Sequence, residues 1–453
     1  MKARFNKISV VGAGYVGLIT GACLSKFGNE VVLIDKNNTK ISQINSGKDP
    51  INEPFLEKII KTSLKKKLIK ATKDINDAIL KTEITFIAVD TPSKKKSIDL
   101  SQVKTVINEL SKVLLLKFKE KKSHHYIVIK STVLPGTTNY LLQILKKKLG
   151  KYSDNVKICS NPEFLRQGFA VNDFLNPDRV VIGSNDKKIE KKIANLYRKL
   201  KCPIILTSIE NSELIKYVSN AFLANLISFS NEISKLCSNI ANTDVQTVLK
   251  ALHLDKRLSV KHKNKIIKPK ILDYLVSGSG YGGSCLPKDV KALNFFLKQN
   301  NIKAPLIESI EKINEEQPHK VIKHFENKIG NIKNMKIAVL GVSFKGDSDD
   351  LRESPALKII NLLKKNGAKI NAWDPAVKKE DVRFLKIRKF SNNLNEVIYK
   401  TDCIFIATGI KKINYFNWKK ISKVVSKKNI YDSRNLLDKK KMRKYFNYHH
   451  IGS

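Results

Sequence analysis

The sequence predicts an α/β protein with two doubly wound domains joined by a central helical domain that contains a long helix. The first supporting observation is an alternation of short β-branched runs with helical patterns, as in 7–11, 16–27 and 30–34. Alternation of this kind is typical of a parallel sheet covered by helices. The N-terminal part is therefore expected to be a parallel α/β domain.

The second observation is a late repetition of the same plan. KISVVG at 7–12 is echoed by KIAVLG at 336–341, and LSKFGNEVVLID at 24–35 is echoed by LKKNGAKINAWD at 363–374. The interval from glycine to aspartate is the same in both copies. We therefore expect a second, related α/β domain at the C-terminal end.

The third observation is a long amphipathic pattern between these two parts. Apolar residues recur at helical spacing from Leu214 to Leu236, and Ser212 is the expected N-cap. A helix of this length can bridge the domains and pair with another subunit. The expected domains are 1–209, 210–325 and 326–453.

A glycine motif follows the first predicted strand. Gly12, Gly14 and Gly17 form G-x-G-x-x-G at the start of a predicted helix, which permits a tight turn, close approach of a pyrophosphate and close packing of the helix on the sheet. Asp35 ends the next strand, where a carboxylate accepts a hydrogen bond from a ribose 2′-hydroxyl and repels a 2′-phosphate. We therefore expect a Rossmann-like domain that binds NAD in preference to NADP.

The C-terminal copy lacks this motif, because Ser343 stands in place of the middle glycine. A dinucleotide is not expected there. Lys345, Arg352 and Arg434 can instead bind the phosphates of another ligand, or they are ordinary surface charges.

The chain is 453 residues long and carries a formal net charge of +44. Such a charge attracts anions of many kinds, including RNA and small anionic substrates. The basic residues are nearly all lysine and are spread over the whole length, without arginine clusters or interleaved aromatic residues. We therefore expect no nucleic-acid partner, and a basic RNA-binding Rossmann-like protein is only the remote alternative.

The lengths of the apolar runs and the spacing of the cysteines limit the class of protein further. No run is long enough to cross a bilayer and no signal-peptide pattern follows Met1, so we expect a cytoplasmic protein without a membrane partner. The six cysteines show no C-x-x-C pair, and no histidines lie at metal spacing. We expect neither disulfides nor a bound metal.

One cysteine differs from the others because it lies in the glycine-rich stretch GSGYGGSCLPKDV. Cys285 precedes a helix that begins near Leu286-Pro287, and a helix N-terminus favours a thiolate. Beside an NAD site, this position indicates covalent oxidation of an aldehyde, although a structural cysteine in a turn is the alternative. Asp289 returns to the same helical face and can activate a water.

Lys216 and Asn220 are also four residues apart, on the long helix. A cation and an amide on one face can stabilise an oxyanion, or they are solvated surface residues.

Together these motifs resemble the UDP-glucose/GDP-mannose dehydrogenase family over nearly the whole chain, and most closely the members that oxidise UDP-glucose at C6. The segments that carry the resemblance are GAGYVG (12–17), KSTVLPGTT (130–138), NPEFLRQGFA (161–170), PDRVVIG (177–183), KYVSNAFLANLISFSNE (216–232), DKR (255–257), GYGGSCLPKDV (280–290), FKGDSDDLRESP (344–355), WDP (373–375) and DSRN (432–435).

The resemblance implies a role for each matching residue. The catalytic set is Cys285 as nucleophile, Lys216 and Asn220 at the oxyanions, and Asp289, Glu163 and Thr132 for water and proton transfer. The NAD contacts are Gly12, Gly14, Tyr15, Val16, Gly17, Asp35, Lys40, Thr91, Thr132 and Arg352. The nucleotide-sugar contacts are Phe164, Leu165, Lys216, Arg257, Tyr274, Leu275, Gly282, Lys345 and Arg434, with Arg257 serving the site of a neighbouring subunit.

The implied reaction converts UDP-glucose, two NAD and water to UDP-glucuronate and two NADH, through a thiohemiacetal and a thioester on Cys285. GDP-mannose or a UDP-N-acetylhexosamine is the alternative substrate, and the implied assembly is a homo-oligomer, at least a dimer. Two departures from the family pattern are Gln167, where many relatives have glutamate, and a basic insertion at 258–273.

Overall fold

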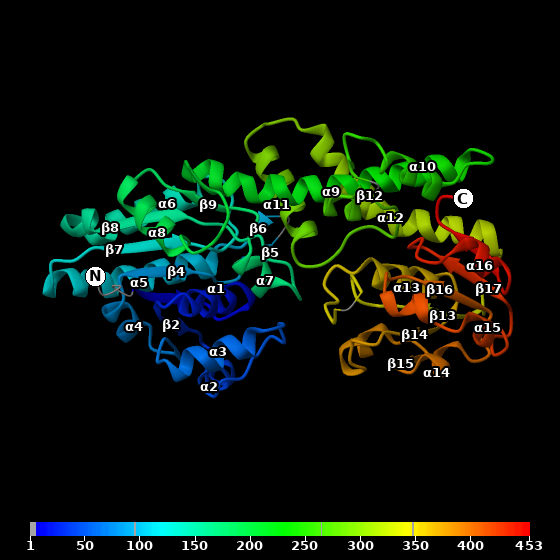
Figure 1. The fold of residues 1–453 in the computed structure, drawn as a ribbon, viewed down its shortest axis with the longest axis horizontal. Coiled ribbons are helices and arrows are strands. Elements are labelled where there is room, and N and C mark those ends of the chain that lie inside the picture. Colours follow the sequence, from blue (N-terminus) through cyan, green and yellow to red (C-terminus); the bar gives the residue numbers. More distant parts are fainter. Residues whose placement is uncertain (1–5, 95–96, 264, 347) are drawn as a thin grey trace. The chain divides into compact units, whose positions relative to one another are not determined.

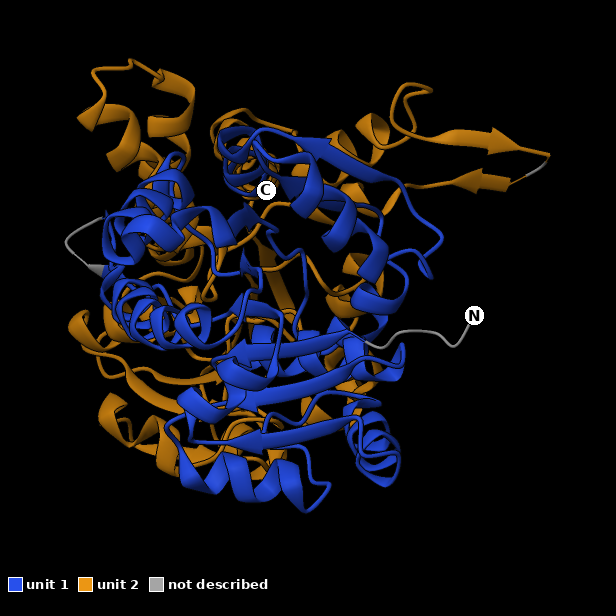
Figure 2. Ribbon diagram, turned by 90° about the vertical axis from the view of Figure 1, so that its left-hand side faces the viewer, with its two compact units in different colours: residues 1–218 blue, residues 219–453 orange. Residues whose placement is uncertain are grey.

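The computed structural model describes residues 6–94, 97–263, 265–346 and 348–453. It divides into two compact units, Met1–Val218 and Ser219–Ser453, which are coloured separately in Figure 2. Each unit contains one large sheet, which is mainly parallel in the first unit and parallel in the second.

The sheet of the first unit has eight strands in the order β10-β9-β8-β7-β4-β1-β2-β3. Figure 1 labels β9, β8, β7, β4 and β2 of this sheet. Its order around β1 is the Rossmann order, and the pairs are parallel except β8 with β9. The strands are β1 (Lys7–Val11), β2 (Glu30–Ile34), β3 (Ile69–Thr72), β4 (Ile84–Ile87), β7 (His125–Ile129), β8 (Val156–Ser160), β9 (Val180–Gly183) and β10 (Ile204–Thr207).

Helices cover both faces of this sheet, which explains why its central strands are apolar on both sides. Ile8 and Leu33 lie in one buried cluster with residues of α1, whereas Ile87 and Ile127 lie in another with residues of α5. The helices are α1 (Tyr15–Lys26), α2 (Asn38–Asn45), α3 (Leu56–Lys65), α4 (Ile75–Lys81), α5 (Ser101–Glu120), α6 (Thr137–Leu149), α7 (Ala170–Leu175) and α8 (Lys187–Leu196). A short hairpin, β5 (Ser93–Lys94) and β6 (Ser97–Ile98), and a 3-10 turn, η1 (Gly150–Asn155), complete the unit.

The expected long helix is α9 (Ile209–Asn239), and the boundary between the units falls within it. The expectation that Ser212 caps this helix is wrong, because the helix begins three residues earlier. Ile209 is only 1% exposed, and its burial favours extension of the helix over a start at the polar residue. The Ser212 hydroxyl lies 3.2 Å from that of Ser160 instead.

The second unit begins with the rest of α9 and with α10 (Val245–Leu252), followed by the basic insertion. The insertion forms a hairpin of β11 (Val260–His262) and β12 (Lys265–Ile267), seen in Figure 2 as a two-stranded arm. The turn η2 (Lys270–Tyr274) and the helices α11 (Leu286–Gln299) and α12 (Pro305–Ile329) come next.

A six-stranded parallel sheet follows, in the order β15-β14-β13-β16-β17-β18. This order is 3-2-1-4-5-6, so the C-terminal part repeats the Rossmann plan and the predicted fold class is confirmed. The strands are β13 (Lys336–Leu340), β14 (Lys369–Trp373), β15 (Lys389–Ser391), β16 (Cys403–Ile406), β17 (Asn429–Asp432) and β18 (Asn447–His450). The helices are α13 (Pro355–Lys365), α14 (Leu394–Ile398), α15 (Trp418–Ile421) and α16 (Lys439–Arg443), with the turns η3 (Glu380–Leu385) and η4 (Lys411–Tyr415).

Among the described residues, no helix combines the length and the apolar character needed to span a membrane.

Candidate active site

The glycine motif forms the turn between β1 and α1 at the carboxyl edge of the first sheet. Gly12 has φ +95°, and a Cβ there would lie 2.6 Å from the carbonyl oxygen of Ala88. A Cβ on Gly17 would lie 1.8 Å from the carbonyl oxygen of Gly12. Both positions therefore exclude any side chain.

Gly14 differs, because a Cβ there would meet no atom within 4 Å. It is the N-cap of α1 and, as a glycine, has no side chain that could cap the helix. The open space and the N–H groups of the first helical turn fit the pyrophosphate of a dinucleotide.

Asp35 follows the end of β2 and remains partly exposed. Its Oδ2 accepts a hydrogen bond from the backbone N–H of Ala13 at 2.8 Å, and its Oδ1 accepts one from that of Asn37 at 2.9 Å. The carboxylate is thus fixed beside the glycine turn, where a ribose would lie. Lys40 is half-buried in the first turn of α2, and its N–H is capped by Asn37.

The loops after β4 and β7 meet at the same edge of the sheet. The hydroxyl of Thr91 donates a hydrogen bond to the backbone oxygen of Thr132 at 2.9 Å. Tyr15 and Val16, in the first turn of α1, pack against the apolar core beneath. The structure therefore brings the first-unit residues predicted to bind NAD to one edge of the sheet.

A buried ion pair lies beyond β8. Lys216 Nζ lies 2.8 Å from Glu163 Oε1, and both side chains are less than 10% exposed. Burial opposes ionisation of Glu163, but Lys216 and the N–H of Leu165 outweigh it, so its pKa lies below the usual value. The Leu165 N–H donates to Glu163 at 2.6 Å. The ring of Phe164 stacks with Arg179, whose guanidinium carbon is 4.1 Å from the ring centroid.

Lys130, which carried no predicted role, lies beneath this pair. Its ammonium donates to the side chain of Asn161 at 3.0 Å and to the backbone oxygen of Pro162 at 3.3 Å. Burial lowers the pKa of Lys130 to about 8. It is part of the KSTVLPGTT segment, but no local pattern distinguishes it from the other lysines.

In the second unit, Cys285 is the N-cap of α11 and is exposed. Asp289 lies one turn further along the helix and is only 1% exposed. Its Oδ2 accepts a hydrogen bond from the Asn220 amide at 2.6 Å, and its Oδ1 pairs with Lys288 at 2.7 Å. The structure therefore brings Asn220 and Asp289, two residues of the expected catalytic set, into contact within this unit.

The backbone of the glycine-rich loop before Cys285 is held by the side-chain amides of Asn231, Asn314 and Gln317. None of these three residues is among the site residues expected from the sequence. The N–H of Gly278 donates to Asn231 at 2.8 Å, and its carbonyl accepts from Gln317 at 2.7 Å. Asn314 accepts from the N–H of Tyr281 at 2.7 Å and donates to its carbonyl at 3.1 Å. The loop before the cysteine is therefore fixed in its backbone.

Two glycines of this loop pack against the segment that follows β13. A Cβ on Gly282 would lie 2.4 Å from the carbonyl oxygen of Glu353. Gly283 has φ +85°, and its N–H donates to the carbonyl of Arg352 at 2.9 Å. The cysteine loop therefore packs directly against the segment 352–353 that follows β13.

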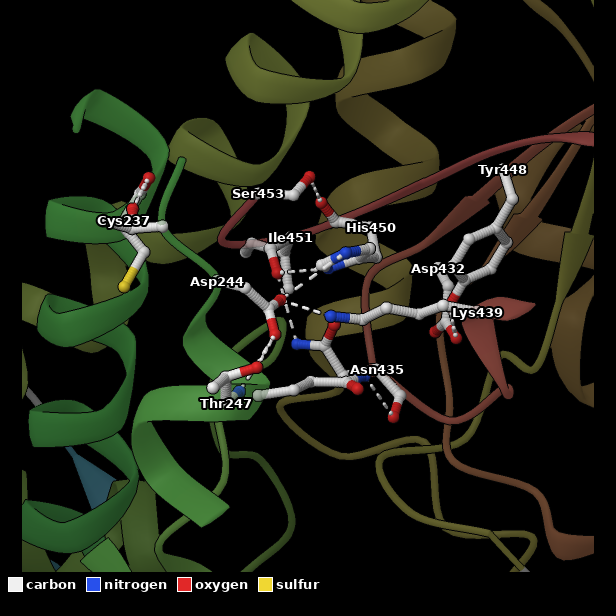
Figure 3. A network of polar contacts seen from close by, with 12 residues as sticks. Cys237, Asp244, Thr247, Asp432, Asn435, Lys439, Tyr448, His450, Ile451 and Ser453 are labelled. Carbon is white, nitrogen blue, oxygen red and sulfur yellow. Dashed lines mark hydrogen bonds and ion pairs between the residues drawn. The ribbon is translucent and has the colours of Figure 1, made fainter. Parts of the chain in front are cut away.

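Arg434 reaches the same loop from the end of β17. Its guanidinium lies 3.5 Å from the carbonyl oxygen of Gly280. The carboxylate of Asp432 accepts from the N–H of Arg434 at 3.0 Å. It also accepts from the hydroxyl of Tyr448 at 2.9 Å, and Figure 3 labels Asp432 and Tyr448. Lys345 Nζ lies 5.5 Å from the centroid of the Phe344 ring. The same ring lies against Gly283, where a Cβ would be 2.8 Å from it.

The remaining predicted ligand residues also belong to the second unit. Arg352 forms a bidentate contact with Asp350. Arg257 forms one with Asp255, and the Arg257 side chain is 88% exposed. Tyr274 is half-buried and Leu275 is buried, with the Leu275 carbonyl 3.0 Å from His253.

Three family models cover the chain in order. They describe the NAD binding domain of the UDP-glucose/GDP-mannose dehydrogenase family at 6–201, its central domain at 210–316 and its UDP binding domain at 338–439. The chain belongs to the UDP-glucose/GDP-mannose dehydrogenase family.

Individual relatives agree with this family membership. The UDP-glucose 6-dehydrogenase of Rickettsia bellii is 36% identical over 98% of this chain and 99% of its own length. The UDP-glucose 6-dehydrogenase TuaD of Bacillus subtilis is 35% identical over 98% of this chain and 93% of its own length.

Among solved structures, the UDP-glucose dehydrogenase of Pyrobaculum islandicum superposes with a TM-score of 0.87 at 28% identity, over 100% of this chain and 98% of that one. The UDP-D-ManNAc dehydrogenase of Pyrococcus horikoshii superposes with a TM-score of 0.84 at 26% identity, over 98% of this chain and 99% of that one.

The family membership confirms the predicted cofactor and class of reaction. The protein is an NAD-dependent oxidoreductase that acts on a nucleotide sugar. The open space at Gly14 and the fixed carboxylate of Asp35 are the features of this chain that fit NAD.

Proposed function

We propose that this protein oxidises UDP-glucose at C6 to UDP-glucuronate, with Cys285 as the covalent nucleophile. The observation that carries the proposal is the exposed Cys285 at the N-terminus of α11, with the buried Asp289 one turn further along this helix and hydrogen-bonded to Asn220 of α9. UDP-glucose is favoured as the substrate because the curated relatives cited above are named for it.

In this proposal the C6 alcohol loses a hydride to NAD and a proton to a base, which gives an aldehyde. The thiolate of Cys285 adds to the aldehyde carbon, and Asn220 stabilises the oxyanion that forms. The thiohemiacetal carbon then loses a hydride to a second NAD and its hydroxyl loses a proton to a base, which leaves a thioester on Cys285. Water, activated by Asp289, breaks the C–S bond and releases the acid and the thiol.

Residues of the first unit have matching roles. Lys216 neutralises developing negative charge, and Glu163 keeps Lys216 in place through the buried ion pair. Thr132 orders a water at the end of β7. The proposed nucleotide-sugar contacts of this unit are Phe164 and Leu165. Those proposed in the second unit are Tyr274, Leu275, Gly282, Lys345 and Arg434. Arg257, which is exposed, serves the site of a neighbouring subunit.

We also propose that the protein is a homo-oligomer, at least a dimer, that pairs through α9. The helix exposes a stripe at heptad spacing, in which Phe222, Phe229 and Leu236 are 46–55% exposed. A stripe of this kind on one helix is self-complementary around a two-fold axis. A reducing compartment such as the cytoplasm is favoured by the thiols of Cys23, Cys159, Cys202, Cys237 and Cys403. We keep the division into domains 1–209, 210–325 and 326–453.

Two measurements test the proposed reaction. UDP-glucose, GDP-mannose and UDP-N-acetylhexosamines are each supplied with NAD, and NADH is counted by absorbance. We expect two NADH for each UDP-glucose consumed. Activity with GDP-mannose alone would contradict the proposed substrate.

Cys285→Ser then tests the nucleophile. We expect the rate of UDP-glucuronate formation to fall by about 10³-fold or more, because the alkoxide is a poor substitute for the thiolate, while UDP-glucose still binds. The matched control is Cys202→Ser, a half-buried cysteine outside the proposed site. Undiminished acid formation by the Cys285 variant would remove this residue from the nucleophile role.

A further inference from the structure

Glu53 lies in the loop between α2 and α3 and is only 4% exposed. Its carboxylate accepts three hydrogen bonds from two separate parts of the first unit. One oxygen accepts from the Tyr15 hydroxyl at 2.5 Å and from the N–H of Gly168 at 2.9 Å. The other accepts from the N–H of Ala170 at 2.6 Å. A buried carboxylate with three donors holds these groups in place strongly, because the loss of any one leaves a charge less well solvated.

The backbone around Glu53 is fixed as well. The carboxylate of Asp49 accepts from the N–H of Ile51 at 2.8 Å and from the N–H of Glu53 at 2.7 Å. Glu53 is therefore held at a defined place before it contacts either partner.

The first partner belongs to the cofactor site. Tyr15 is the first residue of α1, directly after Gly14, whose open side fits the pyrophosphate of a dinucleotide. Its hydroxyl also lies 3.4 Å from the carbonyl oxygen of Arg166. Any displacement of the first turn of α1 therefore disturbs the hydrogen bond to Glu53.

The second partner belongs to the segment 164–170, which begins with the proposed sugar-nucleotide contacts Phe164 and Leu165. This segment behaves as one piece, because Arg166 makes three hydrogen bonds to Asp173 of α7 through its backbone N–H and its guanidinium. The N–H groups of Gly168 and Ala170 at its far end are the ones that donate to Glu53.

We propose that Glu53 is a positioning residue that couples NAD binding to sugar-nucleotide binding. This inference rests on the proposed function, since it takes Phe164 and Leu165 as contacts of the substrate. Each ligand stabilises one of the two partners of the same carboxylate, so each improves the affinity for the other by the same factor.

The coupling has a use in a four-electron oxidation. The reduced cofactor must leave and a second NAD must enter while the sugar is still attached to the enzyme. A carboxylate that ties segment 164–170 to α1 keeps the sugar in position during this exchange. It also restores the first turn of α1 to the same place for the second cofactor.

The test measures the dissociation constant of NADH by its fluorescence, with and without saturating UDP-glucose. These two ligands cannot react together, because the cofactor is already reduced. In the native protein we expect UDP-glucose to tighten NADH binding by at least about fivefold. The coupling ratio is the dissociation constant of NADH without UDP-glucose divided by the constant with it. Glu53→Gln keeps the size of the side chain but turns an NH2 group toward N–H donors. In this variant we expect the coupling ratio to fall within about twofold of one.

Two further variants separate coupling from loss of stability. Tyr15→Phe removes one hydroxyl and leaves the two backbone donors of Glu53, and we expect it to reduce the ratio in part. Glu57→Gln changes a nearby exposed glutamate that pairs with Lys61 on α3, and we expect the native ratio. A purely structural role for Glu53 would lower the melting temperature of its variant but leave the ratio unchanged.

A native ratio of one, or a Glu53→Gln ratio equal to the native value, would overturn the inference. If the Gln variant fails to fold, a native ratio in Tyr15→Phe overturns it in the same way. Failure of the native protein to bind UDP-glucose would defeat the proposed function and this inference with it. Binding of both ligands without coupling would defeat the inference alone.

Discussion

The turns after β1 and after β13 share one backbone design. Gly12 donates its N–H to the carbonyl of Ile34 at 2.8 Å, and Gly341 donates its N–H to that of Trp373 at 2.7 Å. Both glycines have positive φ, at +95° and +91°. In each copy an aspartate after the neighbouring strand accepts a hydrogen bond from the residue that follows the glycine. The strand, the turn and the aspartate therefore occur together in both Rossmann-like domains.

The two turns differ in what surrounds them. Gly14 is open and α1 begins at once, whereas Ser343 is 1% exposed and α13 begins only at Pro355. Asp374 is 1% exposed, and its Oδ2 accepts hydrogen bonds from the N–H of Val342 and from the N–H and the hydroxyl of Ser343. The backbone turn alone is therefore not a dinucleotide site, because the phosphates also need an empty position and a helix N-terminus directly behind it.

The largest effect is expected from Gly14→Ser, which places in the turn after β1 the residue type that Ser343 provides in the turn after β13. Gly14→Ser is compatible with the backbone, since Gly14 has φ −73°, and serine is a favoured N-cap. We expect an unchanged or higher melting temperature. The KM for NAD should rise by roughly tenfold to 100-fold, because the new side chain occupies the space for the pyrophosphate. Steady-state kinetics and thermal unfolding check the two parts of this prediction.

The matched control is Gly136→Ser, at another glycine whose Cβ would meet no atom within 4 Å but whose φ is +87°. This variant should lose stability through backbone strain without a specific rise in the KM for NAD. An unaltered KM in Gly14→Ser would show that the cofactor does not approach this position.

A second comparison exchanges the two aspartates for asparagine. Asp374→Asn should cost about 2–3 kcal/mol of stability, because an amide group cannot accept all the hydrogen bonds that the buried carboxylate accepts. Asp35→Asn should cost about 1 kcal/mol, since Asp35 is partly exposed and water can replace what is lost. The Asp35 variant should instead weaken the preference for NAD over NADP.

Urea unfolding and the ratio of kcat/KM for the two cofactors measure these effects. If both variants lost the same stability and the same cofactor preference, the two carboxylates would have equivalent roles and the contrast between the turns would be wrong.

The fold and the glycine turn could be predicted from the sequence because their signals are local. The strands are short apolar runs, and the interval from Gly12 to Asp35 fixes one turn and one strand end. Other features depend on residues that meet across long intervals. Glu53 contacts Gly168, 115 positions away, and no spacing within the sequence indicates such a pair. Burial distinguishes Lys130 from the many surface lysines, and burial of a single polar residue leaves no periodic pattern.

The smallest effect is expected from the reciprocal change in the second turn, Ser343→Gly. The hydroxyl of Ser343 lies 3.0 Å from Asp374 Oδ2 and 2.9 Å from the carbonyl oxygen of Lys345, so its loss should cost about 1 kcal/mol. The change completes G-x-G in sequence, yet it does not bring a helix N-terminus to the turn and does not free Asp374. Equilibrium dialysis with labelled NAD should therefore still give one NAD site for each chain, and urea unfolding should show only the small loss of stability. A second NAD site in this variant would mean that the middle glycine alone decides whether the turn binds a dinucleotide.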